Sequence, residues 1–414
     1  MIWVHRRGAT AELVKMSIIK LIGLGLWVSP FVFMPSGTRG PKEIFVLSIC
    51  IALGLLAIYR GEIKRFRNNW ILFLIGWFVI NLILAPRFDV ALLGTDASNF
   101  WIWKPFLFCI AYFLAILAIS SANITSKDWT KLLKMLIYPA LIMSVYVIFQ
   151  WFGYDQIFGV KEEAIIGSVT NPQVAGTMGQ PTIVAPFIAM CVPFAIYGRK
   201  YLIALIMIIA VIMTKSMVAI GALSLSIIIL LSFLRMRKMG FIWVIILGLM
   251  LGCMMVPQTR NIVINKVTGE SSGRFVEWPR IIKDTNSPVL GGKKTYPFTG
   301  FGAGSFKYVY ASRMMKGSAP WRQAHNEYIE ILYNFGLFGL FLFLASIFYF
   351  VKRAIPKALS FGGDRIIAIL CSLLCISICA GGTFVWQIGT TAFYTIVLVG
   401  LLHNDNFLNG VNHE

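Results

Sequence analysis

The chain has 414 residues, of which 58% are hydrophobic and 13% are charged, and its mean hydropathy is +0.78. Soluble domains contain roughly 45–50% apolar and about 25% charged residues, so this composition excludes a soluble globule, a disordered chain and a fibrous repeat and indicates a membrane protein. The formal net charge of +20 suits anionic lipid or an anionic substrate, and with this hydropathy nucleic acid is not expected as a partner.

Apolar runs recur along the whole chain. About 20 apolar residues cross the ~30 Å hydrocarbon core of a bilayer. The first run follows Arg6, Arg7 and Lys15, as a signal peptide would, but it lacks a small-residue cleavage pattern and we expect a retained helix. The fold class expected is therefore all-α, a polytopic membrane protein with about twelve transmembrane helices, roughly at 16–34, 42–59, 70–86, 101–119, 132–152, 181–197, 201–214, 217–234, 240–256, 327–351, 366–381 and 384–402.

Basic residues gather in alternate hydrophilic segments, and the segments between them carry far fewer. Short loops rich in Lys and Arg face the cytoplasm, so this pattern places both termini there and requires an even number of spans. It also divides the region 202–234 into two short helices joined by an outer turn at 214–216. The basic clusters are Arg6/Arg7/Lys15/Lys20, Arg60/Lys64/Arg65/Arg67, Lys127/Lys131/Lys134, Arg199/Lys200, Arg235/Arg237/Lys238 and Lys352/Arg353/Lys357/Arg365.

The chain divides into three parts on this basis. Residues 1–256 hold the first nine spans, residues 257–326 form a large outer loop, and residues 327–414 hold the last three spans and a cytoplasmic tail. The loop carries eleven basic residues against three acidic ones. Long loops translocate regardless of charge, so the loop is compatible with this topology and presents a strongly positive surface at the outer face of the membrane.

No pattern of metal ligands or of a serine hydrolase is present. The sequence has no HExxH, DxD or GxSxG motif. Cys371, Cys375 and Cys379 repeat every four residues on one helix face, without a neighbouring histidine or carboxylate, which favours packing over metal binding. We therefore expect neither a metal nor a cofactor.

Candidate functional residues gather on the outer side. His325-Asn326 ends the basic loop, where an imidazole titrates or forms hydrogen bonds, and Glu330 lies about one turn inside the tenth span, where an ionisable group indicates function. The alternative for Glu330 is structural pairing with a loop arginine. Arg274 and Arg280 suit phosphate because the guanidinium binds it bidentately, although most loop charges are merely solvated. Arg322, Asn326 and Gln180 are further binding candidates.

Two other features have both a functional and a structural interpretation. The run 300–306, which contains Gly302 and Gly304, either forms a backbone nest near a phosphate or is a tight turn that returns the loop to the membrane. Lys215 puts a cation at the outer surface, either for an anionic substrate or because lysine commonly snorkels to the interface.

Taken together, these stretches resemble the O-antigen ligase family, whose superfamily includes O-antigen polymerases and protein O-oligosaccharyltransferases. The resemblance rests on Ser272-Gly273-Arg274 with Trp278, on Pro288, on the run 300–306 and on His325-Asn326, which opens a segment similar to HNxYLxxxxExG. The segment 176–181 is similar to the family's entry to a central span, with Gln180 in place of Asn. Two positions depart from the family, with Ser216-Met217 where it often has Ser-Arg-Gly and Asn334 where an acid is expected.

The resemblance implies a GT-C-like glycan transferase at the periplasmic face of the bacterial inner membrane. The donor would be a glycan on a polyprenyl (undecaprenyl) pyrophosphate and the acceptor a glycan or lipid A-core. Arg274 and Lys215, with Arg280, would hold the pyrophosphate. His325 would deprotonate the acceptor hydroxyl or bind the phosphate, and Glu330 would orient His325 or bind the acceptor.

Four functions remain open at this point. The first is a ligase, and a polymerase or a protein O-oligosaccharyltransferase would use the same donor chemistry. A flippase or transporter without chemistry would place its functional charges near the bilayer midplane, within a repeated architecture. The sequence shows no repeat, and the charged candidates lie at the outer edge.

Overall fold

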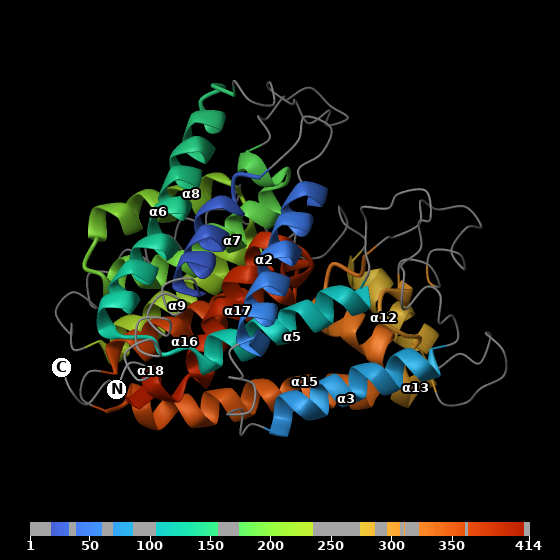
Figure 1. Cartoon of the computed structure of the whole chain (residues 1–414). Helices are drawn as coiled ribbons and strands as arrows, with labels where there is room; N and C mark the ends of the chain where they lie inside the picture. The colour runs from blue at the N-terminus through green and yellow to red at the C-terminus, as the bar shows by residue number, and fades with distance from the viewer. Residues whose placement is uncertain are drawn as a thin grey trace, which may run out of the picture.

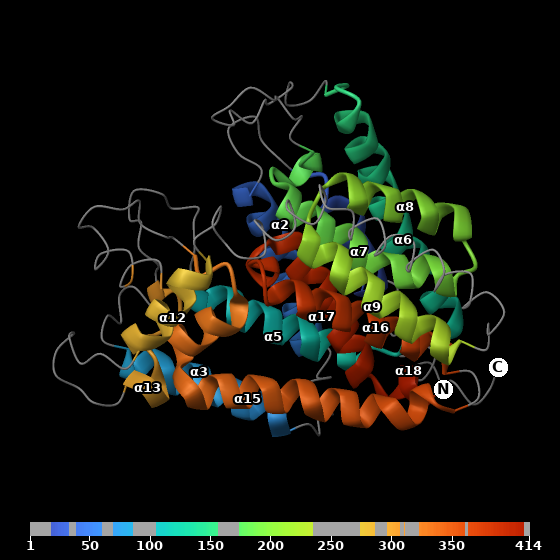
Figure 2. The same cartoon turned by 180° about the vertical axis from the view of Figure 1, so that it is seen from behind.

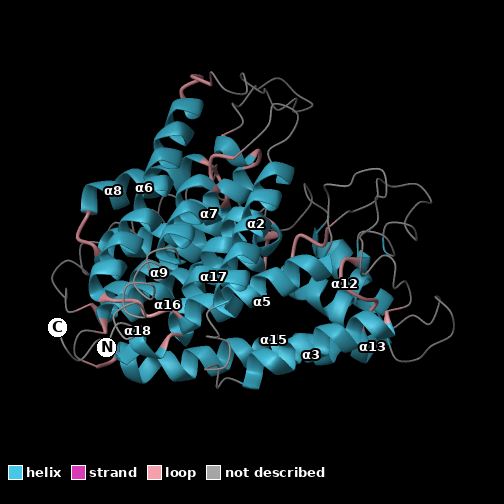
Figure 3. Ribbon diagram, in the orientation of Figure 1, coloured by secondary structure: helices cyan, strands magenta, loops and turns pink. Residues whose placement is uncertain are grey.

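The computed structural model describes residues 18–32, 39–59, 69–85, 105–155, 174–234, 274–285, 296–306, 310, 323–360 and 363–409. Within these ranges all regular structure is helical (Figure 3), and the expected all-α membrane protein is confirmed. The first helix is Ile18–Val28. It is followed by α2 (Arg39–Tyr59), α3 (Asn69–Leu84), α5 (Pro105–Ser121), α6 (Ser126–Trp151), η2 (Gly176–Met178), α7 (Pro181–Tyr197), α8 (Tyr201–Met213), α9 (Met217–Phe233), α12 (Arg274–Thr285), α13 (Tyr296–Thr299), α15 (Glu327–Ala358), α16 (Asp364–Ala380), η4 (Val385–Gln387), α17 (Gly389–His403) and α18 (Asp405–Asn409).

Each expected span that lies within the described residues coincides with a helix, and the ninth, at 240–256, lies outside them. By length and composition, three helices are able to cross a membrane, namely Pro41–Tyr59, α6 and α15, and several shorter apolar helices accompany them. The start of α6 differs from the expected 132 because Thr125 and Asp128 form a capping box that begins the helix at Ser126.

The centre of the bundle is α7, whose residues 183–196 are all buried. It packs against α6, α8, α9 and α16, while α2, α5 and α17 form the adjoining part of the bundle (Figure 1). Glycine lets helices approach closely in membrane proteins, where packing rather than hydrophobicity drives association. Gly54 contacts Leu114 of α5 in this way, and Gly400 of α17 contacts Ile119.

The first described helix is joined to the last long helix of the chain. Tyr394 Oη of α17 donates to Leu26 O at 2.7 Å, and Thr390 Oγ1 donates to Ser29 O at 2.9 Å. Both acceptors are carbonyls near the end of the helix Ile18–Val28, where main-chain carbonyls lack partners within the helix. The side chains of α17 therefore provide hydrogen-bond donors for carbonyls at the end of the first described helix.

The longest helix, α15, runs along the edge of the molecule beside α3, and α12 and α13 lie near its N-terminal end (Figures 1 and 2). Gly336 breaks its regular geometry, with φ of 70° and ψ of −177°. The turn at Gly300 packs against this kink so closely that a Cβ on Gly300 would lie 2.5 Å from Asn334 O and from Gly336 N. The turn at Gly300 is thus held on α15 through backbone contacts.

Three of the basic segments predicted from the sequence, at 127–134, 199–200 and 352–365, meet at one end of the described bundle. At the start of α6, Trp129 packs against Tyr197 and Phe407. At the end of α15, Arg353 forms an ion pair with Asp405, and Arg365 donates to Phe407 O at 2.7 Å. The ends of α6, α7, α15 and α16 that carry the basic residues therefore lie together around α18.

Candidate functional site

The site lies at the opposite end, where α12 is fastened to two other parts of the chain. Arg274 Nη1 donates to Gly382 O at 3.0 Å in the turn between α16 and α17. One helical turn later, Trp278 Nε1 donates to Ala324 O at 2.8 Å, just before α15. A small aromatic cluster, formed by Ile281, Phe301, Phe306, Tyr310, Ala324 and Tyr333, supports this arrangement.

Arg274 and His325 are brought to the same turn. The His325 ring meets the Phe384 ring edge-on with centroids 5.1 Å apart, two residues beyond Gly382. Burial, and then the charge of Arg274, lower the pKa of His325 to about 4, and burial also lowers the pKa of Arg274. A neutral imidazole therefore lies beside a guanidinium cation at neutral pH.

The backbone of His325 is held in an unusual conformation. Its φ is 50°, a left-handed value that costs a non-glycine residue energy and indicates a constrained position. Asn326 follows as the N-cap of α15, and its Oδ1 accepts from Tyr328 N and Ile329 N. Glu330 Oε2 accepts from Ala324 N at 3.2 Å. Both side chains therefore hold the segment that carries His325. The sequence alone does not distinguish this structural role from substrate binding.

The glycine-rich run forms a tight turn. Gly302 N donates to Asn334 O at 2.9 Å, and Phe306 N donates to Asn334 Oδ1 at 3.0 Å. These bonds favour the structural interpretation for Gly302, because its N–H is already used. Asn334 stands where the family has an acid, and here its side-chain oxygen accepts the bond from the turn. Gly304 lines the cavity described below.

The other predicted binding residues lie apart from Arg274 and His325 or are already engaged. Arg280 is exposed and forms an ion pair with Glu277 at 2.7 Å. Lys215 lies at the turn between α8 and α9, with its Nζ 4.9 Å from the centroid of the Trp151 ring. Gln180 is exposed at the start of α7, without a side-chain capping bond. Arg322 lies outside the described residues.

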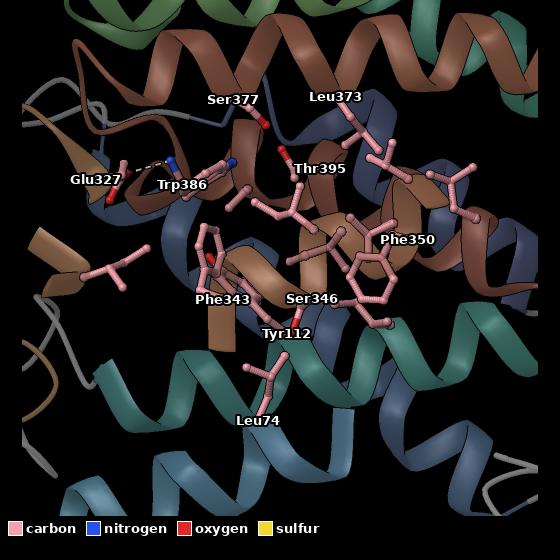
Figure 4. Close-up of a pocket in the computed structure, with 18 of the residues that line it drawn as sticks. Leu74, Tyr112, Glu327, Phe343, Ser346, Phe350, Leu373, Ser377, Trp386 and Thr395 are labelled. Atoms are coloured by element: carbon pink, nitrogen blue, oxygen red, sulfur yellow. Dashed lines mark hydrogen bonds between the residues drawn. The ribbon is translucent and has the colours of Figure 1, made fainter. Parts of the chain in front are cut away.

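An elongated cavity of about 960 Å³ lies between α15 and the rest of the bundle (Figure 4). One end is polar and is lined by Gln323, Glu327, Glu330 and Gln387. From there the cavity extends along α15 towards Leu359, over an apolar lining from α3, α5, α16 and α17. In Figure 4 Glu327 and Trp386 lie at one end, while Phe350 and Leu373 lie at the other.

Two carboxylates at the cavity were not singled out from the sequence. Glu327 is only 5% exposed, and its oxygens accept from Trp386 N, Gln387 N and Gln387 Nε2. Glu43 of α2 is also buried and lines the cavity. The position of Glu327, two residues after His325 at the start of an apolar run, was a usable sequence signal, whereas Glu43 lies far from every motif in the chain.

Residues 202–344 match a family model described as O-antigen ligase. The resemblance to the O-antigen ligase family is confirmed. The matched segment contains Arg274, Lys215, the glycine-rich turn and the histidine motif, and it ends within α15. The match supports a glycan-transferring enzyme of the ligase and polymerase type. No curated protein matches the chain.

Proposed function

We propose that the protein is a ligase that transfers a glycan from a polyprenyl pyrophosphate carrier to an acceptor hydroxyl, with lipid A-core as the acceptor. The observation that carries this proposal is that Arg274 and His325 share the α16–α17 turn, whose later residues Trp386 and Gln387 line the polar end of an apolar cavity. The donor has an anionic pyrophosphate and a long apolar tail, so a cation close to an apolar groove suits it.

In the proposed reaction the acceptor oxygen attacks the anomeric carbon of the glycan. The new carbon–oxygen bond forms as the bond to the pyrophosphate breaks, and the pyrophosphate leaves with the electron pair of that bond. Arg274 stabilises the negative charge that develops on the leaving oxygen, because a fixed cation needs no reorganisation at that moment. His325 would offer an unprotonated ring nitrogen that takes the proton of the acceptor hydroxyl.

The cavity would hold the polyprenyl tail. Its lining beyond the polar end is almost entirely apolar, with Leu74, Phe113, Phe343 and Ile347 among the lining residues. The tail would pass from lipid into an equally apolar groove, so packing against the lining rather than transfer out of water would hold it there, with no specific geometric requirement. This suits a flexible isoprenoid and supports a donor that stays in the membrane during transfer.

We also propose that the site faces the periplasm and that both termini are cytoplasmic. The grouping of Arg353, Arg365 and the start of α6 at the opposite end of the bundle supports this orientation, because basic residues favour the cytoplasmic side. Reporter fusions after α6 and after α9 would test it.

The test of the proposed function compares a deletion strain with its parent. Surface glycans and the lipid-linked glycan pool are separated side by side on a gel. Full-length chains that remain on the carrier, with bare core, would support the ligase. A single repeat unit on the core without a ladder would instead identify a polymerase, and an unchanged profile would contradict both and redirect the search to protein glycosylation or transport.

A further inference from the structure

The turn between α16 and α17 is the element on which the proposed site is assembled. Arg274 donates to Gly382 O at its beginning, and the His325 ring lies against Phe384 in its middle. These two residues come from different parts of the chain, α12 and the segment before α15. Their relative position therefore depends on how this turn is fixed to α15.

Glu327 supplies that attachment. Its Oε1 accepts from Trp386 N at 2.9 Å and from Gln387 N at 3.2 Å, and its Oε2 accepts from Gln387 Nε2 at 3.1 Å. The carboxylate is buried and its bond to Trp386 is drawn in Figure 4. Gln323 Nε2 donates to Gln387 Oε1 at 3.1 Å from the same side. Three donors converge on its two oxygens, so the Glu327 side chain is the main attachment between the two segments.

The fastening acts close to the proposed reacting groups. Glu327 is two residues from His325, whose φ of 50° needs a rigid setting. The residues that Glu327 holds, Trp386 and Gln387, lie two and three positions beyond Phe384. A loosened turn would move Gly382 and Phe384, and with them Arg274 and His325, by a fraction of an ångström without unfolding the helices. Misplacement on that scale is costly for catalysis.

We propose that Glu327 is a positioning residue for glycan transfer, which sets Arg274 and His325 relative to each other by holding the α16–α17 turn. The inference rests on the proposed function and adds to it a residue whose carboxyl oxygens are engaged by the turn, although its side chain also lines the polar end of the cavity. It predicts that changes at Glu327 lower kcat and leave the KM for the donor nearly unchanged.

An exchange of the two interacting groups tests the inference. In Glu327→Gln the new amide would direct an N–H towards the Gln387 amide N–H, and in Gln387→Glu two carboxylates would face each other. The double variant restores one acceptor and one donor across the contact. We expect each single variant to lose about tenfold or more in kcat and the double variant to recover to within about threefold of the wild type, since residues in one hydrogen-bond network couple.

The measurement uses the full-length protein in membrane vesicles with a lipid-linked glycan donor, and the amount of each variant is determined by immunoblot. Asp128→Asn is a matched control, because Asp128 Oδ2 also accepts hydrogen bonds at a helix start, from Thr125 N and Thr125 Oγ1, but lies far from the site. It should transfer glycan at the wild-type rate.

The outcomes separate the inference from the proposed function. A wild type that transfers no glycan would refute the proposed function. An active wild type with an equally active Glu327→Gln variant would overturn only the inference, as would losses that simply multiply in the double variant. If a single variant does not accumulate, Gln387→Ala removes one of the three donors and keeps both backbone bonds, and it must still lower kcat.

Discussion

Arg274 is the residue on which the proposed chemistry depends most directly. Its guanidinium is partly buried and donates to Gly382 O. We expect Arg274→Ala to lower transfer by about 10²–10³-fold, the usual cost of removing one group that stabilises developing charge. Arg274→Lys should also fall well below the wild type, because lysine lacks the planar fork that binds phosphate bidentately. Initial transfer rates in membranes, corrected for the amount of protein, provide the measurement.

Arg280→Ala is the matched control for this prediction. Arg280 lies on the same helix, but it is exposed and paired with Glu277, and an exposed pair contributes little to stability. Equal losses for Arg274→Ala and Arg280→Ala would reduce Arg274 to one of many basic residues in the loop. Full activity of Arg274→Lys would argue against a bidentate contact.

His325 predicts a pH dependence of stability. Its pKa is lowered from an ordinary value near 6.5 to about 4 in the folded protein, so between these values the unfolded chain binds the additional proton. The contribution of His325 is therefore fully present above about pH 6.5 and is lost as the pH falls towards about 4. His325→Gln lacks this titration, so the wild type should lose more thermal stability than the variant between pH 7 and pH 5. Parallel loss in both proteins would contradict the burial of a neutral imidazole.

The sequence pointed to residues that the fold brings together, but not to their contacts. Arg274 and His325 were predicted from a motif and chemical type, and the structure places them on one turn. Asn326 was expected to bind substrate, but its Oδ1 caps α15. Glu327 was not singled out, because its partners follow it by about 60 residues and only the fold brings them together.

At the level of elements, the contact between Gly300 and Gly336 fixes the loop on α15. Both glycines have positive φ values, 71° and 70°, which other residues adopt only at a cost. A Cβ on Gly300 would also meet the backbone of Asn334 at 2.5 Å, and backbone cannot move aside as a flexible side chain does. We expect Gly300→Ala and Gly336→Ala each to destabilise the protein by about 3 kcal/mol or more, measured by thermal unfolding in detergent.

Gly76→Ala provides the control for this pair. Gly76 lies within α3 and has nothing within 4 Å of the position of a Cβ. Alanine favours a helix over glycine by roughly 1 kcal/mol, so this variant should be as stable as the wild type or slightly more so. Equal stability of all three variants would show that the loop turn does not need its close approach to the kink.

Hydropathy predicted the helices well because the membrane requires long apolar helical runs. The exact ends of the helices were harder to predict, because capping groups such as Thr125 and Asp128 determine them. The kink in α15 was not predicted, because Gly336 lies in an apolar run where glycine is also common without any kink. Its conformation follows from the packing of a turn that is distant in sequence.

At the level of the whole molecule, the cavity along α15 predicts which substitutions block the donor. Ser346 is buried and lines the cavity, whereas Phe348, two residues later, is 68% exposed. Ser346→Trp would fill part of the groove, and we expect it to raise the KM for a long polyprenyl donor by about tenfold or more, equivalent to about 1.4 kcal/mol of binding. Transfer rates measured against donor concentration test this expectation.

Phe348→Trp places the same indole on the exposed face of the same helix and should leave the donor KM unchanged. A short-chain donor separates a blocked groove from a distorted helix, because it should be much less affected by Ser346→Trp. Equal effects of Ser346→Trp on short and long donors would show that the tail does not lie along α15.

The bonds from Tyr394 and Thr390 to the first described helix join residues that are 368 and 361 positions apart in sequence. A ribosome adds residues in chain order. The donors to the carbonyls of Leu26 and Ser29 are therefore synthesised only when nearly the whole chain has been made. The turn that receives Arg274 and His325 belongs to the same late hairpin. The proposed site is therefore complete only at the last stage of biosynthesis, and a partly inserted chain would lack the turn on which the proposed transfer depends.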